Sequence, residues 1–561
     1  MPQSITASQQ GSLAEIVVDQ PNIRSKARVL AILAALYLSL FVAALDQTII
    51  ATAIPTISNQ LHGSSGFVWI GGAYLLANAA AAPIWAKLSD IWGRKPILLL
   101  VVAWFFGSSI ICATAKSMNV LIIGRAFQGT AGGGLIQLVN ITLSDLFSMR
   151  SRALYIGLLE TMWCVAGGIG PILGGTFAEL ISWRWAFWIN LPVSGSTFFL
   201  LLFFLDVHNP RTNAFDGIKA IDWFGSFSIL GLTVMFLLGL NFGGEAFPWS
   251  SPQVICLIVF GALMSVLFIF SEKKLARYPL MPPNIFSHRS NISTLLVTFF
   301  HGITFIGAEF YLPLYFQSVR QASPLKSGVL VLPFIVLEAL MGITAGVIIH
   351  QTGRYLELIY VGLFLLTLGG GLYILFDAHA SLAKIIIIEI VAGIGGGLLF
   401  EPPLIALQAM VRQDEVATAT GTLGFIRNLA CSLGVVIGGV IFQNGMETRS
   451  DSLRAAGLPP DLLNAFSGHD AEANVLLVGS IQNGTQKMAV KEAYAGSLKN
   501  VWIFYTCTAA CALLCSVFIA RAVLSTEHVE TKTGLKEKEM EDNGAQEMPA
   551  ETSIELQQTV A

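Results

Sequence analysis

This chain of 561 residues carries little charge and shows no disulfide framework. Asp, Glu, Lys and Arg make up 12% of it, against about a quarter in soluble domains. Hydrophobic residues make up 54%, more than a soluble fold of this length can bury, so the composition predicts a polytopic membrane protein. The seven cysteines all fall in apolar runs, and none lies in the long polar stretch 444–501, which argues against a disulfide-stapled module.

Several chemical signatures are also missing. There is no Walker loop, no HExxH and no G-x-S-x-G, which argues against an ATP-driven pump and against an enzyme. No basic stripe follows the pattern of nucleic-acid binding, and we expect no cofactor. Cys507, Cys511 and Cys515 would share one helix face, but no His or acid accompanies them, so small-residue packing is favoured over a metal or redox role.

Long apolar runs predict fourteen transmembrane helices, because a span needs about 20 apolar residues. Basic residues gather on one side of these spans, within 24–28, 87–95, 150–152 and 273–277. The positive-inside rule then places both termini in the cytoplasm and the stretch 444–501 outside. The expected spans lie near 29–50, 67–85, 97–115, 120–142, 154–177, 185–205, 221–241, 252–270, 292–316, 327–349, 357–377, 383–404, 420–443 and 502–522.

The polar ends and the spans divide the chain into five parts. We expect a disordered cytoplasmic N-terminus at 1–28, a six-helix half at 29–205, two inserted helices with their flanking loops at 206–291, a second six-helix half at 292–524 with an extracellular loop at 444–501, and a disordered cytoplasmic tail at 525–561. That loop carries a sequon at Asn483. Asn483 is therefore a candidate glycosylation site, although a three-residue sequon also arises by chance.

The two halves share an internal repeat. The segment 124–133 (GRAFQGTAGG) aligns with 388–397 (IEIVAGIGGG) at an offset of 264 residues (388 − 124). Glycine-rich helices can match by chance, but these matches keep their order and topology, which indicates two parallel six-helix halves. The further matches are Gly170, Gly174 and Gly175 with Gly434, Gly438 and Gly439 at the same offset, and Gly93 with Gly353 at an offset of 260 (353 − 93).

A charged motif lies between two apolar runs at 86–96 (AKLSDIWGRKP). Charge is costly inside a bilayer, so Asp90, Arg94 and Lys95 are expected at the membrane surface, where they can pair, while Gly93 lets the connection turn sharply. The motif resembles the signature loop of the major facilitator superfamily of secondary transporters, although alanine replaces its usual first glycine and isoleucine its usual arginine. The resemblance implies a conformational latch; a plain cytoplasmic turn is the alternative.

Two further motifs place charges inside spans. The segment 45–55 (LDQTIIATAIP) resembles the first-helix motif of the fourteen-helix drug:proton antiporters, and 124–129 (GRAFQG) resembles the fourth-helix arginine motif of the superfamily. Asp46 is thus a candidate proton carrier, and Arg125, which cannot readily deprotonate, a candidate modulator of its protonation. A structural hydrogen bond for Asp46 and a static tether for Arg125 are the alternatives.

The segment 166–175 (AGGIGPILGG) resembles the antiporter motif of the fifth helix, which in this family marks exporters. Small residues let helices approach closely, and a proline removes a backbone donor and permits a kink; ordinary small-residue packing is the alternative. The segment 183–192 (WRWAFWINLP) also recurs in the fourteen-helix branch, and its aromatic rings predict an anchor at the outer membrane surface. The residues assigned to the antiporter motif are Gly167, Gly170, Pro171, Gly174 and Gly175.

More acids lie within or beside the predicted spans. Any of them can carry a proton or contact a cationic substrate, but helix ends and polar packing account for many such residues. Glu389 stands out because it occupies the position equivalent to Arg125 in the repeat, and we take Glu389 and Glu160 as further candidates for proton coupling. The full set is Glu160, Glu309, Glu338, Glu389 and Glu401.

Over roughly 29–525 the chain is thus similar to the fungal-type drug:proton antiporters with fourteen helices, an all-α membrane protein of the major facilitator fold. The resemblance implies alternating access in the plasma membrane, with protons entering as an amphipathic drug, toxin or secondary metabolite leaves, and a monomer in the lipid bilayer. A siderophore or vacuolar basic amino-acid transporter shares this architecture and is the alternative. A channel would need no glycine-rich contact between paired halves.

Overall fold

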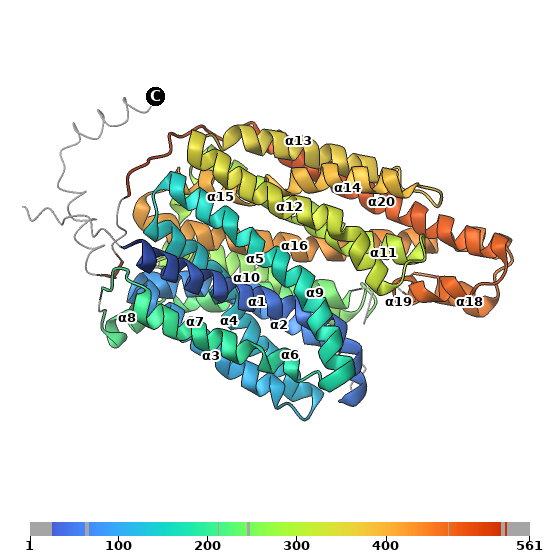
Figure 1. The fold of residues 1–561 in the computed structure, drawn as a ribbon, viewed down its shortest axis with the longest axis horizontal. Coiled ribbons are helices and arrows are strands. Elements are labelled where there is room, and N and C mark those ends of the chain that lie inside the picture. The colour runs from blue at the N-terminus through green and yellow to red at the C-terminus, as the bar shows by residue number, and fades with distance from the viewer. Residues whose placement is uncertain are drawn as a thin grey trace, which may run out of the picture.

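The computed structural model describes residues 25–61, 67–210, 212–243, 247–468, 470–528 and 533–535. These residues form a bundle of long helices that run side by side (Figure 1), and no strand occurs among them. Helices α1–α7 make one half, drawn from blue to green, and α11–α16 with α20 make the other, drawn from yellow to red. The expected all-α architecture of two helical halves is therefore present.

The helix bounds follow the expected spans closely at most positions. In the first half they are α1 (Lys26–Gln60), α2 (Phe67–Trp92), α3 (Arg94–Ala113), α4 (Met118–Leu146), α5 (Met149–Thr176), α6 (Trp185–Trp188) and α7 (Asn190–Phe204). Between the halves lie α8 (Ala214–Ala220), α9 (Trp223–Phe242) and α10 (Pro252–Phe270). In the second half they are α11 (Arg289–Ser318), α12 (Pro324–Thr352), α13 (Leu356–Tyr373), α14 (Leu382–Gly397), α15 (Glu401–Gln408), α16 (Val416–Glu447) and α20 (Gly484–Ser516).

Twelve helical stretches in the described part of the chain are long and apolar enough to cross a membrane. The helices α2 and α4 are not among them, but they have 26 and 29 residues and pack lengthwise between the others. Arg125, Gln128 and a run of glycines make α4 less apolar than its neighbours. Counting these two helices, the fold is consistent with the fourteen spans expected (12 + 2).

Helix boundaries follow local capping chemistry. Ser117, Ser323 and Ser381 cap α4, α12 and α14 with side-chain oxygens that accept a backbone N–H of the first turn, which satisfies one of the free donors there. The expected span 383–404 consists of two helices, α14 and α15. Pro402 and Pro403 have no backbone N–H and therefore cannot continue α14. They lie in the first turn of α15, where a helix needs no N–H donor.

The repeat is visible in the packing between helices. A Cβ on Gly129 of α4 would meet the backbone of Tyr74 in α2, and a Cβ on Gly393 of α14 would meet the carbonyl of Phe334 in α12. Tyr74 and Phe334 are themselves 260 residues apart (334 − 74), so both halves use glycine for the same close helix approach. The connection after α2 and its counterpart after α12 both turn through a glycine with positive φ, 91° at Gly93 and 71° at Gly353.

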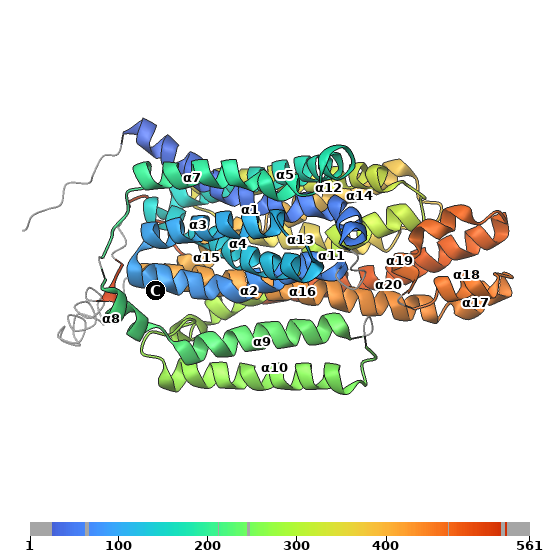
Figure 2. The same ribbon diagram turned by 90° about the horizontal axis from the view of Figure 1, so that it is seen from below.

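The inserted helices α9 and α10 form a pair on the outside of the bundle (Figure 2). They pack against each other, and α9 also contacts α2 of the first half and α16 of the second. Ile229 of α9 packs with Phe425 of α16 in one buried cluster. The pair therefore lies along the seam between the halves.

The stretch 444–501 differs from the loop that the sequence predicts. The helix α16 continues to Glu447, the short helices α17 (Ser450–Ala455), α18 (Pro460–Ala465) and α19 (Asp470–Ala473) follow, and α20 begins at Gly484 rather than near 502. A hydropathy window sees only the apolar part of a helix, so it misses extensions that project into water. Phe466 and Tyr494 of this segment are fully buried and belong to the same apolar cluster as Tyr311 and Phe442 of the second half.

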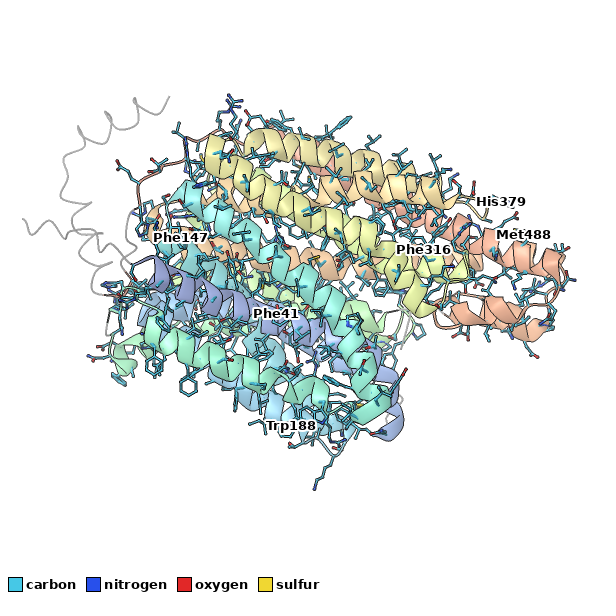
Figure 3. The ribbon with its side chains drawn as sticks, in the orientation of Figure 1. Phe41, Phe147, Trp188, Phe316, His379 and Met488 are labelled. Atoms are coloured by element: carbon cyan, nitrogen blue, oxygen red, sulfur yellow. The ribbon has the colours of Figure 1, made fainter. Side chains whose placement is uncertain are left out.

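The chain ends of the described region meet at one end of the bundle, which we call the basic end because Arg94, Arg150 and Arg152 lie there (Figure 1). Figure 3 places Phe147 at this end and His379 and Met488 at the opposite end. The arrangement agrees with an even number of crossings, and the basic residues indicate that this end faces the cytoplasm.

The halves meet near the basic end. Gln408 of α15 accepts a hydrogen bond from Arg152 of α5 at 3.0 Å and donates one to Ser144 of α4 at 2.9 Å. A Cβ on Gly157 of α5 would lie 3.0 Å from the carbonyl oxygen of Gly342 in α12. Further along α5, toward the opposite end, Ile172 is 65% exposed. The halves are thus closed at the basic end, while the apolar face of α5 at Ile172 is open to its surroundings.

The first residues of the tail that was expected to be disordered make hydrogen bonds with the bundle. Arg150 donates through its backbone N–H to the carbonyl of Ser525 at 3.4 Å and through Nε to that of Leu524 at 3.2 Å. Gly534 donates its N–H to the carbonyl of Asp90 at 3.0 Å. The tail therefore makes contacts before 536, while the predicted N-terminal segment up to 24 and the end of the tail lie outside the described residues.

A protease test checks this topology. A tag placed after residue 561 should resist protease added to intact cells, because both ends are expected in the cytoplasm. A tag inserted next to Gln482, which is exposed at the opposite end, should be cleaved in the same experiment and serves as the control. Cleavage of the C-terminal tag from outside would contradict the even number of spans.

Candidate functional site

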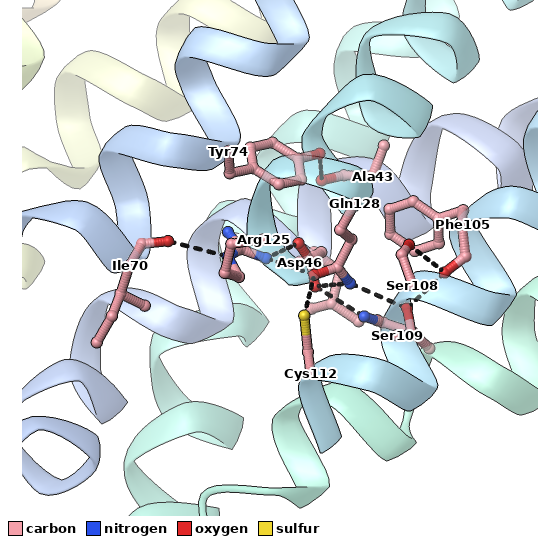
Figure 4. Close-up of polar contacts among 12 residues, drawn as sticks. Ala43, Asp46, Ile70, Tyr74, Phe105, Ser108, Ser109, Cys112, Arg125 and Gln128 are labelled. Atoms are coloured by element: carbon pink, nitrogen blue, oxygen red, sulfur yellow. Dashed lines mark hydrogen bonds and ion pairs between the residues drawn. The ribbon is translucent and has the colours of Figure 1, made fainter. Parts of the chain in front are cut away.

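Asp46 sits in a buried polar network within the first half (Figure 4). Its Oδ2 pairs with Nη1 of Arg125, and its Oδ1 accepts hydrogen bonds from Nε2 of Gln128 at 2.8 Å and Nδ2 of Asn190 at 2.7 Å. These four residues, which we call the Asp46 network, come from α1, α4 and the start of α7. All are at most 1% exposed.

Arg125 has partners besides Asp46. Its Nε donates to the carbonyl of Ile70 at 3.0 Å, its Nη1 also donates to Oε1 of Gln128 at 2.8 Å, and its guanidinium lies 4.4 Å from the ring centre of Tyr74. A buried guanidinium needs such acceptors, because leaving a buried charge without a partner costs several kcal/mol. Arg125 thus keeps a carbonyl, an amide oxygen and an aromatic face if Asp46 becomes neutral.

The structure brings Asp46 and Arg125 together, as the motifs indicate, and adds two residues that sequence reasoning missed. Gln128 lies in the same motif as Arg125, three residues on. Asn190 lies in the aromatic string 183–192, which was expected to anchor the protein at the membrane surface. Trp183 is fully buried and donates through Nε1 to Gln60 at 2.8 Å, whereas Trp185 is 49% exposed, so the anchor at the membrane surface stays a prediction for Trp185. The sequence feature that could have identified Asn190 is a polar amide side chain within an otherwise apolar and aromatic segment.

The charged motif at the end of α2 forms a second buried cluster. Arg94 donates to Asp90 at 2.6 Å through Nη1 and to Asp145 of α4 at 2.6 Å through Nε, and its side chain is 2% exposed. Asp145 was not singled out from the sequence. Among the described residues, the side-chain hydrogen bonds of this cluster join α2, α3 and α4, which all belong to the first half. Asp90 Oδ2 is buried without a hydrogen-bond partner. Lys95 is half-buried beside it.

The glycines of the α5 motif divide into two sets. A Cβ on Gly170 or Gly174 would collide with Thr48 or with the carbonyl of Ile49 in α1, whereas Gly167 and Gly175 border open space. Close to Pro171, α1 also bonds to α5 directly, since Thr48 donates to the carbonyl of Ala166 at 2.8 Å and Thr52 to that of Pro171 at 3.1 Å. Two glycines of the motif therefore serve the α1–α5 contact.

Glu160 and Glu401 are brought together across the halves. A Cβ on Gly342 would lie 3.0 Å from Glu160 Cγ and 3.3 Å from Glu401 Oε1. Both carboxyl oxygens of Glu401 are buried without a hydrogen-bond partner. Arg427 of α16 is within electrostatic reach of both acids, and it donates to the carbonyl of Phe400 at 2.9 Å.

Of the remaining predicted residues, Glu309 lies within electrostatic reach of Glu160, whereas Glu389 and Asn483 lie elsewhere in the second half. Glu309 is half-buried on α11, and Glu389 is fully buried on α14. Asn483 is exposed and caps α20, with its Oδ1 accepting the N–H of Thr485 at 2.9 Å. Its glycosylation stays a prediction. No group of His, Cys, Asp and Glu residues in the described ranges could hold a metal ion.

Comparison with known proteins gives concordant matches. The family model described as the Major Facilitator Superfamily matches residues 36–435. "Efflux pump dotC" of Dothistroma septosporum is 44% identical over 505 residues, which cover 90% of this chain and 86% of that protein. "MFS-type transporter ppz2" of Metarhizium majus is 43% identical over 512 residues, 91% and 88% of the two chains. "Efflux pump FUS6" of Gibberella fujikuroi is 35% identical over 530 residues, 93% and 95%.

Two solved structures share the fold. The proton:xylose symporter XylE aligns with a TM-score of 0.55 at 13% identity, over 89% of this chain and 98% of that one. The human organic anion transporter MFSD10 aligns with a TM-score of 0.54 at 15% identity, over 87% and 100%. At these identities the likeness concerns the fold alone.

The Arg94 cluster yields a stability prediction. Arg94→Ala leaves Asp90 and Asp145 buried and facing each other without a cation, which should cost about 3–5 kcal/mol and lower the melting temperature of the purified protein. Arg454→Ala is the control, because its pair with Asp451 has side chains 72% and 93% exposed and should not shift melting measurably. Equal melting of both variants and the wild type would mean that the cluster is not structural.

Proposed function

Because the chain belongs to the major facilitator superfamily, we propose that this transporter exports an amphipathic drug, toxin or secondary metabolite in exchange for protons. Relatives that align along nearly the whole chain are named efflux pumps, which supports the direction of transport. The observation that carries proton coupling is the Asp46 network, a carboxylate buried in the first half and paired with a guanidinium that has other acceptors.

The Asp46 network suits a proton carrier for a physical reason. Protonating Asp46 removes its attraction to Arg125, and Arg125 then relies on Ile70, Gln128 and Tyr74. The helix α1 can thus pack against α4 and α7 in two ways, one with Asp46 charged and one with Asp46 protonated. A proton that enters from outside selects one packing, and its release to the cytoplasm restores the other.

A contiguous set of contacts leads from this network to the boundary between the halves. Thr48 follows Asp46 by two residues on α1 and bonds to α5. On α5, Gly157 contacts Gly342 of α12, and Glu160, about one helical turn further on, meets the same glycine. A change in how α1 packs is therefore passed by α5 directly to the second half. The closure at the basic end fits the outward-facing state of an alternating-access cycle.

We propose that Asp90, Gly93, Arg94 and Lys95 act as the conformational latch at the cytoplasmic face. Arg94 holds the end of α2 rigidly to α4, and this end is where the second half docks, since a Cβ on Gly421 of α16 would lie 2.9 Å from that of Ala86. Asp90→Asn or a bulky residue at Gly93, whose φ is positive, should then impair transport without removing the protein from the membrane.

The proposed setting is a monomer in the plasma membrane with a small organic substrate. One observation favours a second candidate function, which is transport of a basic amino acid into the vacuole, or of a siderophore, by the same fold. Glu160 and Glu401 meet between the halves, and two acids there suit a cationic head group. Location in the vacuolar membrane, with no export of amphipathic probes, would favour this alternative.

Asp46→Asn tests the proton coupling. The amide keeps the shape of the carboxyl group but cannot titrate, so we expect gradient-driven transport to be abolished while downhill exchange survives. The measurement uses inside-out membrane vesicles with an acidified lumen and follows uptake of rhodamine 6G and of the neutral dye Nile red. Wild-type uptake should rise as the lumen is made more acidic and should collapse with a protonophore.

Asp461→Asn is the matched control, because Asp461 is exposed on α18 outside the bundle. It should transport like the wild type. Full accumulation by Asp46→Asn would move the proton site away from Asp46, with Glu389 and Glu160 as the next candidates. Failure of the wild type to accumulate any probe would contradict drug export itself.

A further inference from the structure

A small cavity lies inside the second half, enclosed by α11, α12, α13, α14 and α20. Five of its eleven lining residues are aromatic, namely Phe305, Phe334, Tyr373, Trp502 and Tyr505. The space is on the scale of about one water molecule, so a drug-sized substrate does not fit there in this conformation. Only a very small ligand can occupy it.

Two residues that line this cavity and two acids close to it have buried polar atoms without a hydrogen-bond partner among the described residues. They are the hydroxyl of Tyr373, Nε1 of Trp502, Oε1 of Glu338 and both carboxyl oxygens of Glu389. Their side chains are between 0% and 6% exposed. A buried polar group without a partner costs about 1–3 kcal/mol, so a ligand that satisfies several of them at once is strongly favoured.

The geometry ties these four groups to one place. Tyr373 and Trp502 both line the cavity, with ring centres 5.0 Å apart. A Cβ on Gly396, also in the lining, would lie 3.0 Å from Glu338 Oε1. Glu389 precedes the lining residue Ala392 by about one helical turn, and Tyr373 is within electrostatic reach of both Glu338 and Glu389.

The repeat gives this place a counterpart in the first half. Glu389 is equivalent to Arg125 (389 − 125 = 264), and Glu338 is equivalent to Asn78 (338 − 78 = 260). In the first half the charge of Arg125 is balanced by Asp46. In the second half, acids occupy the positions equivalent to Arg125 and Asn78. Neither acid makes an ion pair in the described part of the chain. A proton is a positive charge small enough to reach these two acids through a cavity of this size and neutralise them.

The groups within electrostatic reach of Glu338 do not supply a cation. The guanidinium of Arg427 lies over Phe400, which packs against the lining residue Phe305, and it is not within reach of Glu338. Glu309 of α11 and both Glu160 and Cys164 of α5 lie within electrostatic reach of Glu338. Tyr505 of α20 lines the cavity, and His301 of α11 stacks on Phe305 beside it. Carboxylates that share a dry space repel each other, so uptake of a proton by the group lowers its energy.

We propose that Glu338, Glu389, Tyr373 and Trp502 form a second proton-binding site in the second half, bridged by ordered water. The proton adds to a carboxylate oxygen, and water accepts hydrogen bonds from Tyr373 and Trp502 while donating to the carboxyl groups. A role in the transport cycle rests on the proposed function. With Asp46 as the first site, the transporter would then move two protons in each cycle.

Infrared difference spectroscopy of the full-length protein in lipid tests proton binding without any substrate. The carbonyl stretch of protonated carboxylic acids should fade as the pH rises in the wild type. Glu338→Gln and Glu389→Gln should each lose part of this pH-dependent band, and the double variant should lose more. Tyr373→Phe, which removes one hydroxyl and preserves the ring, should shift the band without abolishing it.

Two variants serve as controls. Glu357→Gln alters an acid that pairs with Arg521 near the surface and should leave the band unchanged. Asp46→Asn should leave the contribution of Glu338 and Glu389 intact, which separates the two proposed sites. Unchanged pH-dependent bands in both Gln variants and in Tyr373→Phe would overturn this inference.

The outcomes separate this inference from the proposed function. If the band is lost in the Gln variants but no pH gradient drives transport, the second proton site stands and proton-coupled export fails. If Asp46→Asn abolishes gradient-driven transport while the Gln variants keep the full band, export stands and the second site is wrong.

Discussion

A charge inside a bilayer must be neutralised by a partner or by a proton, and the arrangement of this transporter follows from that constraint. Arg125 is the basic side chain buried deepest in the first half, and α1, α4 and α7 converge on it through Asp46, Gln128 and Asn190. At the basic end the same need draws Asp90 and Asp145 around Arg94. Each buried cation thereby fixes how three helices pack.

The second half meets the constraint differently. Its buried acids Glu338, Glu389 and Glu401 have oxygens without hydrogen-bond partners among the described residues, although the helices around them repeat the packing of the first half. A pseudo-symmetric scaffold thus carries paired charges on one side and unpaired acids on the other. This asymmetry gives the first half an ion pair that protonation of Asp46 can break, and the second half acids that protons can neutralise.

Much of the architecture could be predicted from the sequence, because hydropathy and glycine spacing are local signals. The glycine repeat predicted two parallel halves, which share the close contacts at Gly129 and Gly393. The charged motif predicted that Asp90 and Arg94 can pair, but it placed them at the membrane surface, whereas the pair is buried. Asn190, Asp145 and the Glu160–Glu401 contact escaped prediction, since each depends on which distant helix lies opposite. The helical form of 444–501 also escaped, because its buried apolar residues are scattered among polar ones and a hydropathy window averages them out.

The central claim is that Asp46 exchanges a proton each time a substrate leaves. The most direct measurement follows lumenal pH in right-side-out vesicles that are preloaded with a transported probe and start without a pH gradient. Downhill efflux of the probe should draw protons inward and acidify the lumen in the wild type, while Asp46→Asn should release the probe without acidification. Efflux from wild-type vesicles with no change in lumenal pH would contradict the account.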